Sequence, residues 1–267
     1  MLANYHTHTV RCKHAKGTER EYIEAAIANG FKVLGFSDHV PQPFKNGFVS
    51  TIRMDMSEIP NYVDTLLKLR EEYKDRIKIY IGFEVECYSD YFDELMAELK
   101  KYPIDYMILG QHHVPNEDNG TYVGFKTDSE EVLKLYADTV IKAMKTELFA
   151  YLAHPDLINF TGPEEVFEKH MKRVIQASID DDYPLEINLY GFVDERQYPS
   201  DRFFKLASTM GAKFIIGCDA HKPGLLIQPD TIPGFADFLN RNGIVTTDYS
   251  DPDLLIKKKL SDLNDHI

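Results

Sequence analysis

Short apolar runs rich in β-branched and aromatic residues recur along the chain, and each is followed by a segment whose apolar positions have helical spacing. This alternation is typical of parallel strands joined by crossover helices. Seven runs fit the description: 2–8, 32–39, 77–86, 105–113, 148–154, 184–191 and 213–221. Seven repeats without a reversal signal favour a closed α/β barrel over an open doubly wound sheet.

Residues typical of helix ends support the prediction of helices between the runs. Thr18 and Glu21 form a capping box at the start of the first helix, and Gly30 is placed to end it. Loop 40–56 is long for a connection and contains two prolines and two phenylalanines, so it is a candidate lid over a site. Further helices are expected at 57–75, 90–101, 128–146, 163–180, 199–210 and 233–242, with a short last strand at 242–250 and a closing helix at 251–265.

Composition indicates a globular chain, with 43% hydrophobic and 27% charged residues. No linker, low-complexity tract or repeat interrupts it, so we expect a single domain over residues 1–267. The formal charge of −13 disfavours nucleic acid and anionic membranes as partners, because both require Lys and Arg. No stretch approaches the roughly 18 apolar residues of a membrane span and no secretory leader is evident, so a cytoplasmic location is expected. Nothing in the sequence predicts an oligomeric state.

Common catalytic motifs are absent from the sequence. Cys12, Cys87 and Cys218 lie far apart with no C-x-x-C pair, which argues against a disulfide framework and a thiolate zinc site. They are expected to be buried thiols. There is no G-x-G-x-x-G, Walker A or G-x-S-x-G motif, so nucleotide cradles and serine hydrolase elbows have no support.

Histidines and acids gather where the predicted strands end. In a parallel barrel these ends meet on one face, which is where active sites lie. Six of the seven runs end in such residues, and only the sixth does not. The residues are His6, His8, Asp38, His39, Glu84, Glu86, His112, His113, His154, Asp219 and His221, with His14 in the loop after the first run.

The spacing indicates a metal site. His6 and His8 are two apart on a strand, so their side chains leave from the same face. Imidazole and carboxylate ligands suit Zn, Mn or Fe, and a carboxylate such as Glu84 can bridge two ions. About nine ligands exceed the needs of one ion, so two or three divalent ions are implied. Neighbouring strand residues point opposite ways, so only one of His112 and His113 is expected to be a ligand.

Each of these histidines and acids could instead have a structural role. A single histidine at a strand end is usually structural, but eight of the ten histidines lie at strand ends or in the loop after the first run, which structure alone does not explain. His170, within a predicted helix, and His266, near the end, are expected to be non-functional. Asp38 and Glu86 are expected to support ligands rather than to bind metal.

The segments HTHTVRCKH, GFSDHVP, GFEVE, GQHH, AHPD and GCDAH resemble, in this order, the motifs of the PHP (polymerase and histidinol phosphatase) family. The resemblance covers nearly the whole chain and is strongest to the histidinol-phosphate phosphatase branch, through EYIEAAIANGF at 21–31, EIN at 186–188 and YPS at 198–200. It implies a distorted, TIM-like (β/α)7 barrel with three metal ions at the C-terminal ends of its strands. In GQHH the family more often has His followed by Phe, which favours His112 as the ligand.

The resemblance also implies how the ligands are shared among the ions. One ion would take His6, His8, Glu84 and Asp219. A second would share Glu84 and add His112 and His154. The third would take His14, His39 and His221.

The branch implies a histidinol-phosphatase of histidine biosynthesis, which hydrolyses the small phosphorylated substrate L-histidinol phosphate to L-histidinol and phosphate. A hydroxide bridging two ions would attack phosphorus, and Asp219 or His221 is the candidate that assists the leaving group. The sixth run, free of metal ligands, would recognise the substrate. The candidates for substrate contacts are Asn188, Tyr190 and Arg196, with His113, the aromatic residues Phe44, Phe48, Tyr122 and Phe192 for the imidazole, and the acids Glu117, Asp194 and Glu195 for the ammonium.

Two alternatives stay open. The chain could be a PHP-type phosphoesterase that acts on another small phosphate ester or a nucleotide, although its acidic charge weighs against nucleic acid. It could also be a module that only binds, although such a relic would not need all nine ligands.

Overall fold

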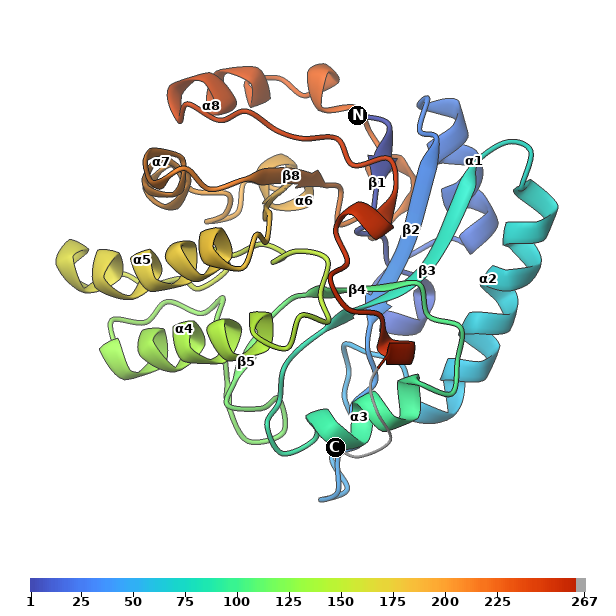
Figure 1. The fold of residues 1–267 in the computed structure, drawn as a ribbon, viewed down its shortest axis with the longest axis horizontal. Helices are drawn as coiled ribbons and strands as arrows, with labels where there is room; N and C mark the ends of the chain where they lie inside the picture. The colour runs from blue at the N-terminus through green and yellow to red at the C-terminus, as the bar shows by residue number, and fades with distance from the viewer. Residues whose placement is uncertain (263–267) are drawn as a thin grey trace.

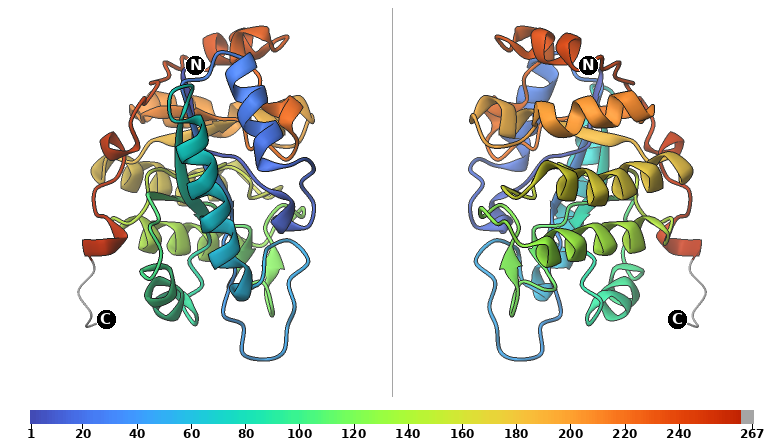
Figure 2. Two further views of the ribbon diagram at one scale, coloured as in Figure 1. Left: turned by 90° about the vertical axis from the view of Figure 1, so that its right-hand side faces the viewer. Right: turned by 90° about the vertical axis from the view of Figure 1, so that its left-hand side faces the viewer.

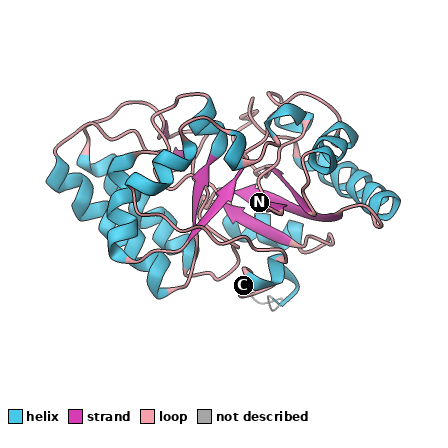
Figure 3. Ribbon diagram, turned by 90° about the horizontal axis from the view of Figure 1, so that it is seen from above, coloured by secondary structure: helices cyan, strands magenta, loops and turns pink. Residues whose placement is uncertain are grey.

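The computed structural model describes residues 1–262, in which parallel strands form a curled sheet. Four strands pair in chain order, and two more pair further along. Figure 3 shows the strands in the middle of the molecule with helices on both sides. The strands are β1 (Ala3–Asn4), β2 (Val33–His39), β3 (Lys78–Val85), β4 (Tyr106–Leu109), β7 (Leu185–Asn188) and β8 (Phe214–Gly217).

Single bridges close this sheet into a barrel. Leu152, in the fifth predicted run, bridges in parallel to Leu109 on one side and to Leu185 on the other. Thr7 and Ala220 bridge in parallel across the last gap, after β1 and β8. The ring therefore has seven parallel segments, and the prediction of a distorted (β/α)7 barrel is confirmed.

The predicted helices between the runs are present, shorter by one to three residues at most ends. Thr18 accepts a hydrogen bond from the Glu21 amide while Glu21 caps the Thr18 amide, so the capping box is confirmed. The helices, shown in Figure 1, are α1 (Glu19–Ala28), α2 (Ile59–Tyr73), α3 (Phe92–Leu99), α4 (Glu130–Met144), α5 (Glu164–Asp180), α6 (Leu189–Val193), α7 (Asp201–Met210) and α8 (Phe235–Arg241).

The first, fourth, sixth and seventh predicted strands end earlier than expected, and two of them lead directly into another element. After Leu109 the chain turns into a small antiparallel hairpin of β5 (His113–Val114) and β6 (Thr121–Tyr122). The sixth run becomes helical at Leu189, because the Asn188 side chain accepts a hydrogen bond from the Gly191 amide and starts α6. Both turns occur at the mouth of the barrel, where they bring side chains over its opening.

The predictions for the C-terminal region are wrong within the described residues. In place of a last strand, the segment 242–250 makes a single bridge, from Thr246 to Phe214. In place of a closing helix there are two short 3-10 helices, at Pro252–Leu254 and Leu260–Asp262, and residues 263–265 of the predicted helix lie outside the described residues. The Lys258 amide donates to the Glu147 carbonyl, a tertiary hydrogen bond that replaces a helical one.

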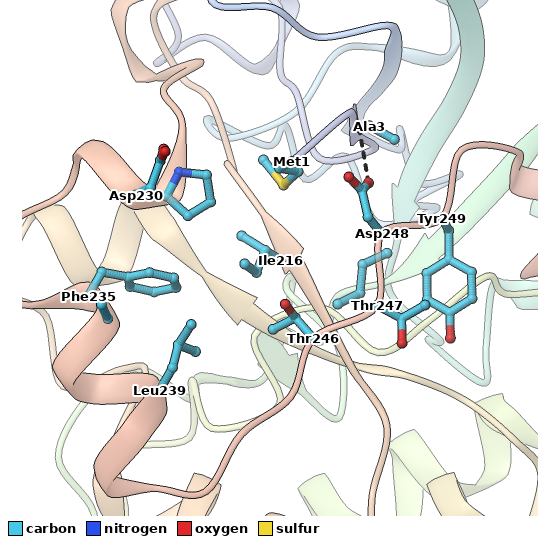
Figure 4. A pocket seen from close by; sticks show the side chains of 13 residues that line it. Met1, Ala3, Ile216, Asp230, Phe235, Leu239, Thr246, Thr247, Asp248 and Tyr249 are labelled. Atoms are coloured by element: carbon cyan, nitrogen blue, oxygen red, sulfur yellow. Dashed lines mark hydrogen bonds between the residues drawn. The ribbon is translucent and has the colours of Figure 1, made fainter.

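This C-terminal segment fills the seam between β1 and β8 at the base of the barrel. The carboxylate of Asp248 accepts hydrogen bonds from the amides of Leu2 and Ala3, and the Thr247 amide donates to the Phe214 carbonyl. Figure 4 shows Asp248 beside Ala3, at a cavity of about 380 Å³ that Ile216, Phe235 and Leu239 also line. The first residues of the chain are therefore held in place by the segment that follows α8.

The interior of the barrel is closed below the mouth by tyrosines. The rings of Tyr5 and Tyr106 meet edge to face at 5.5 Å, and the Tyr106 hydroxyl donates to the Tyr5 carbonyl at 2.7 Å. Tyr151 is buried in the same cluster. A larger apolar core lies between the strands and the helices. Among the described residues, no helix has both the length and the apolar character that a bilayer crossing requires.

Candidate metal centre

All nine predicted metal ligands lie at the mouth of the barrel, where the strands end. His39 closes β2, Glu84 lies near the end of β3 and His154 ends the fifth run. The residues that come shortly after β1, β4 and β8 are His6, His8, His112, Asp219 and His221. His14 comes from the loop after the 3-10 helix Val10–Cys12. These residues are spread over positions 6 to 221 of the sequence, and the barrel brings them together.

Glu84 lies at the centre of the cluster. One oxygen, Oε1, is 2.7 Å from His154 Nε2 and 3.5 Å from His112 Nε2. The other, Oε2, is 2.9 Å from His39 Nδ1 and 3.5 Å from His6 Nε2. A carboxylate with different imidazoles at its two oxygens has the arrangement of a bridging ligand.

Asp219 and His221 form the other side of the cluster. Asp219 Oδ1 is 3.0 Å from His8 Nε2 and 3.5 Å from His6 Nε2. His221 Nε2 lies 2.9 Å from His14 Nε2, and donor atoms of His14, His39 and His221 all fall within 4.8 Å of one another. The same holds for His6, His8 and Asp219, and for His6, Glu84 and His154.

Four of the donor atoms in this cluster lack hydrogen-bond partners. His6 Nε2, His8 Nε2, Glu84 Oε2 and Asp219 Oδ1 are buried and unpaired. Buried polar atoms in native proteins are nearly always satisfied, and leaving one unpaired costs about 1–3 kcal/mol. Nitrogen and carboxylate donors pointing into one space are the ligands that divalent transition ions prefer. The residues therefore fit divalent metal ions.

The buried carboxylates and histidines of the cluster stabilise one another's charged forms. Burial disfavours the charged form of Glu84, but His112, His39 and His6 outweigh it and hold the pKa of the carboxyl well below its usual range. Burial also opposes the charge on His6, yet Glu186, Asp219 and Glu84 raise its pKa to about 10. These carboxylates thus attract positive charge, which a metal ion supplies.

His14 has the opposite shift. Burial, together with the neighbouring His221 and His8, lowers its pKa to about 4. Its Nδ1 is 2.6 Å from the Cys12 carbonyl, which fixes the ring and leaves Nε2 directed at His221. At neutral pH the ring is uncharged, the form in which imidazole binds metal.

Glu186 supports the cluster from the sixth strand, a role that the sequence reasoning missed. Its Oε1 is 2.7 Å from His6 Nδ1, and its Oε2 accepts from the His154 amide at 2.9 Å. Such a carboxylate fixes the ring of a ligating histidine and raises its basicity. An acid within the otherwise apolar run at 184–191, on the same strand face as Asn188, was the available signal.

Two glycines make room for the central carboxylates. An alanine Cβ at Gly110 would lie 2.0 Å from Glu84 Oε1, and one at Gly217 would lie 1.8 Å from Glu186 Oε1. Both contacts are far below the closest approach of real Cβ atoms, so each glycine lets a strand backbone pass directly beside a carboxylate.

Asp38 and Glu86 lie beside ligands, as the sequence suggests. Asp38 accepts from the amide and hydroxyl of Thr9 and lies 3.4 Å from His8 Nδ1. Glu86 Oε1 is 3.1 Å from His112 Nδ1.

Arg53 is a further residue that sequence reasoning missed. It belongs to loop 40–56, is fully buried, and donates to Glu86, to Glu117 at 2.6 Å and to the Val40 carbonyl at 2.9 Å. The C-terminal part of the candidate lid is therefore fixed to the carboxylate that supports His112. A lone arginine in a long loop gave no signal. Figure 2 shows the rest of this loop extending beyond the barrel, beside the β5–β6 hairpin.

A cavity of about 520 Å³ opens onto the cluster. The metal-ligand candidates His14, His39, His112, Asp219 and His221 form one wall. Of the residues predicted to contact substrate, Tyr190, Arg196, His113, Phe48, Tyr122 and Glu117 line it, joined by Tyr198, which the sequence reasoning missed.

Other predicted contact residues lie away from this cavity. Asn188 is not among its lining residues, because its amide donates to Glu186 at 3.0 Å and to Asp219 at 3.1 Å. Phe192 packs on Phe235 and Phe238 instead. Neither they nor the remaining candidates, Phe44, Asp194 and Glu195, line it.

Arg196 is held in place at the edge of the cavity. Its guanidinium lies 4.2 Å from the centre of the Tyr190 ring, and its Nε donates to Asp194 at 2.9 Å. The Tyr190 ring is in turn 5.1 Å from that of His221. The arginine thus lines the same cavity as the candidate metal ligands.

Residues expected to be structural have structural surroundings. His170 is buried, with its Nε2 3.0 Å from Glu130 of α4, and His266 lies outside the described residues. Cys12, Cys87 and Cys218 are free and buried, as predicted, but Cys12 Sγ lies within 4.8 Å of donor atoms of His8 and His221, at the edge of the cluster.

The chain was compared with known proteins. It matches the family model of the PHP domain over residues 4–189. It is 28% identical to a "probable histidinol-phosphatase" of Deinococcus radiodurans, over 84% of this chain and 87% of the relative. It is 26% identical to the histidinol-phosphatase of Lactococcus lactis, over 82% of this chain and 83% of that one.

A solved structure has the same fold. It is the histidinol phosphate phosphatase of Lactococcus lactis in complex with zinc, L-histidinol and phosphate, which superposes with a TM-score of 0.68 at 20% identity over 92% of this chain and 95% of that chain. The family model covers well over half of the chain, so the family suggested by the sequence motifs is confirmed. This chain belongs to the PHP domain family.

Proposed function

We propose that this protein is a metal-dependent phosphomonoesterase that hydrolyses L-histidinol phosphate to L-histidinol and phosphate. The observation that carries the proposal is the convergence of nine nitrogen and carboxylate donors at the mouth of the barrel, beside a cavity with an arginine at its edge. Because the donors span residues 6 to 221, we also infer that residues 1–267 act as one domain.

Two or three divalent ions fit the donor set. His6, His8 and Asp219 surround one position, Glu84 and His154 another, and His14, His39 and His221 a third. His112, 3.5 Å from Glu84 Oε1, completes the second group. When bound, divalent ions supply a nucleophile at neutral pH and neutralise the charge on the phosphoryl oxygens.

The cavity suits the substrate in both charge and shape. Arg196, held by Asp194 over the Tyr190 ring, binds a phosphoryl oxygen next to the cluster. His113 and Tyr122, whose rings are 5.4 Å apart, contact the organic part together with Phe48. Glu117, which accepts from Ser50 and Arg53, is the carboxylate for the substrate's ammonium group.

Asn188 acts indirectly in this scheme. It holds Asp219 by donating to its Oδ2, so it orients a ligand instead of contacting the substrate. Asp219 and His221 both line the cavity, where they reach the leaving oxygen. Either of them could then assist the departure of the leaving group.

The relatives support the choice of substrate. Curated relatives named histidinol-phosphatase match more than four fifths of this chain, and the Lactococcus lactis structure with the same fold binds zinc, L-histidinol and phosphate. Other relatives, such as one of Shewanella pealeana at 25% identity, are named only as a probable phosphatase, so another small phosphate ester is the second candidate substrate.

The test is phosphate release by the zinc- or manganese-loaded protein over a panel of monophosphates that includes L-histidinol phosphate. We expect L-histidinol phosphate to have the highest kcat/KM, and His8→Asn to remove both activity and bound metal. His170→Asn replaces a buried histidine outside the cluster and should keep both. Bound metal without release from L-histidinol phosphate would refute the substrate assignment, and activity on other monoesters would then retain the phosphatase class.

A further inference from the structure

A second cavity lies away from the metal centre, between α3 and the end of α4. It has a volume of about 700 Å³ and is lined by α3 and the two lysines that follow it, by the end of α4 and the turn up to Leu148, and by Lys258 from the C-terminal segment. α4 packs closely on α5, whereas α3 and α4 leave this space between them. We call it the lysine groove.

The lining of the lysine groove is unusually basic for this chain. Five lysines face two carboxylates, in a protein whose formal charge is −13. They are Lys100, Lys101, Lys142, Lys145 and Lys258, against Asp93 and Glu147. Clustered positive charge in a concave site raises the local concentration of anions, even where the protein as a whole repels them.

The lysines are only partly engaged by the protein. Lys101 pairs with Glu98 at 2.5 Å, and Lys142 donates to the Ser89 hydroxyl at 3.2 Å. Within residues 1–262, the side chains of Lys145 and Lys258 make no hydrogen bond or ion pair. Two lysine side chains from separate segments that line one cavity therefore remain available.

The floor of the lysine groove is apolar. Met96 and Leu148 are buried there, and Phe92 is half-buried. Cys87 belongs to the same floor, and burial raises the pKa of its thiol to about 11, so it is uncharged at neutral pH. Ligand sites typically combine such an apolar lining with a few charged groups that fix orientation.

We propose that the lysine groove binds a small organic anion, in which an aromatic or apolar body lies on the floor and phosphate groups contact Lys142, Lys145 and Lys258. Lysine ammonium groups act as point charges for phosphate oxygens. The site is separate from the metal centre, since the two cavities share no lining residue. The inference does not depend on the proposed function.

The test uses ADP-ribose as the probe, because it has an aromatic base and two phosphate charges but no terminal phosphomonoester for the enzyme to hydrolyse. Binding to the metal-loaded protein is measured by calorimetry. In Lys142→Glu/Lys145→Glu, two attractive charges become repulsive, and we expect the affinity to fall by about tenfold or more. Adenosine, which lacks the phosphates, should bind more weakly than ADP-ribose to the original protein.

The matched control is Lys169→Glu/Lys172→Glu on α5. It changes the same formal charge at the same spacing, outside the lysine groove, and should leave the affinity for ADP-ribose unchanged. If Lys142→Glu/Lys145→Glu does not fold, Lys142→Gln/Lys145→Gln provides the same comparison. The proposal is overturned if ADP-ribose does not bind saturably or binds all variants with equal affinity. It is also overturned if the substitutions change only the melting temperature, which is the effect expected of charges at a helix C-terminus.

Discussion

Gly110→Ala would test whether Glu84 is the shared ligand of the metal centre. The new Cβ would lie 2.0 Å from Glu84 Oε1, whereas ordinary contact begins at 3.4 Å. The carboxylate is buried against His154, so it must move by more than about 1 Å to relieve the clash. A displacement of this size at a catalytic group lowers activity by about 100-fold.

The assays are zinc content, phosphate release from L-histidinol phosphate and thermal unfolding. We expect zinc and activity to be lost together, with a loss of about 1–3 kcal/mol in the free energy of unfolding from overpacking. Gly224→Ala is the control, since its Cβ would meet no atom within 4 Å.

A double variant separates displacement of Glu84 from general damage. Aspartate at position 84 is one methylene shorter, so adding Gly110→Ala to Glu84→Asp should cost less stability and zinc than adding it to the original protein. If Gly110→Ala keeps full zinc content and activity, Glu84 does not have the central position that the structure gives it.

Four further predictions follow from the same geometry. Glu186→Gln, which weakens the contact to His6 Nδ1, should lower zinc affinity by about 10- to 100-fold in a chelator competition, and unchanged affinity would contradict its positioning role. Arg196→Ala should raise KM for L-histidinol phosphate with little change in melting temperature, and an unchanged KM would exclude the phosphate contact. Chelation of the metal should lower the melting temperature, and zinc should restore it, since binding to the folded state alone is stabilising. Because the Cys87 pKa is raised to about 11, its alkylation in the native protein should be slow at pH 8, increase as the pH approaches 11, and become fast in urea, as followed by peptide mapping; rapid native labelling at pH 8 would refute this.

The barrel was predictable because its signals are local and repeated. Runs such as 32–39 and 77–86 are rich in β-branched and aromatic residues, and they become β2 and β3 almost in full. The fifth run, LFAYLAH, is also apolar but has no β-branched residue, and it forms only bridges at Leu152. Where the chain leaves the barrel, its conformation depends on tertiary hydrogen bonds, such as the one from the Lys258 amide to the Glu147 carbonyl. No local sequence pattern predicts such contacts.

The position of the candidate ligands at the mouth of the barrel was predictable, and the residues that surround them were less so. Ligands follow strands, and strand ends converge by topology, so position in sequence sufficed for Glu84 and Asp219. The support of His6 by Glu186 depends on which strand face points inward across the barrel. Arg53 reaches Glu86 from a loop whose path the sequence does not determine.

The seam between β1 and β8 has a consequence for synthesis on the ribosome. His6 and His8 are synthesised long before Ala220 and Asp248, but β1 is held by Asp248, and the Thr7 bridge requires Ala220. Domains generally fold as units during translation. A nascent chain stalled before residue 220 would expose unpaired histidines and an open sheet edge, so we expect the candidate metal site to assemble only after the segment up to Asp248 has been made.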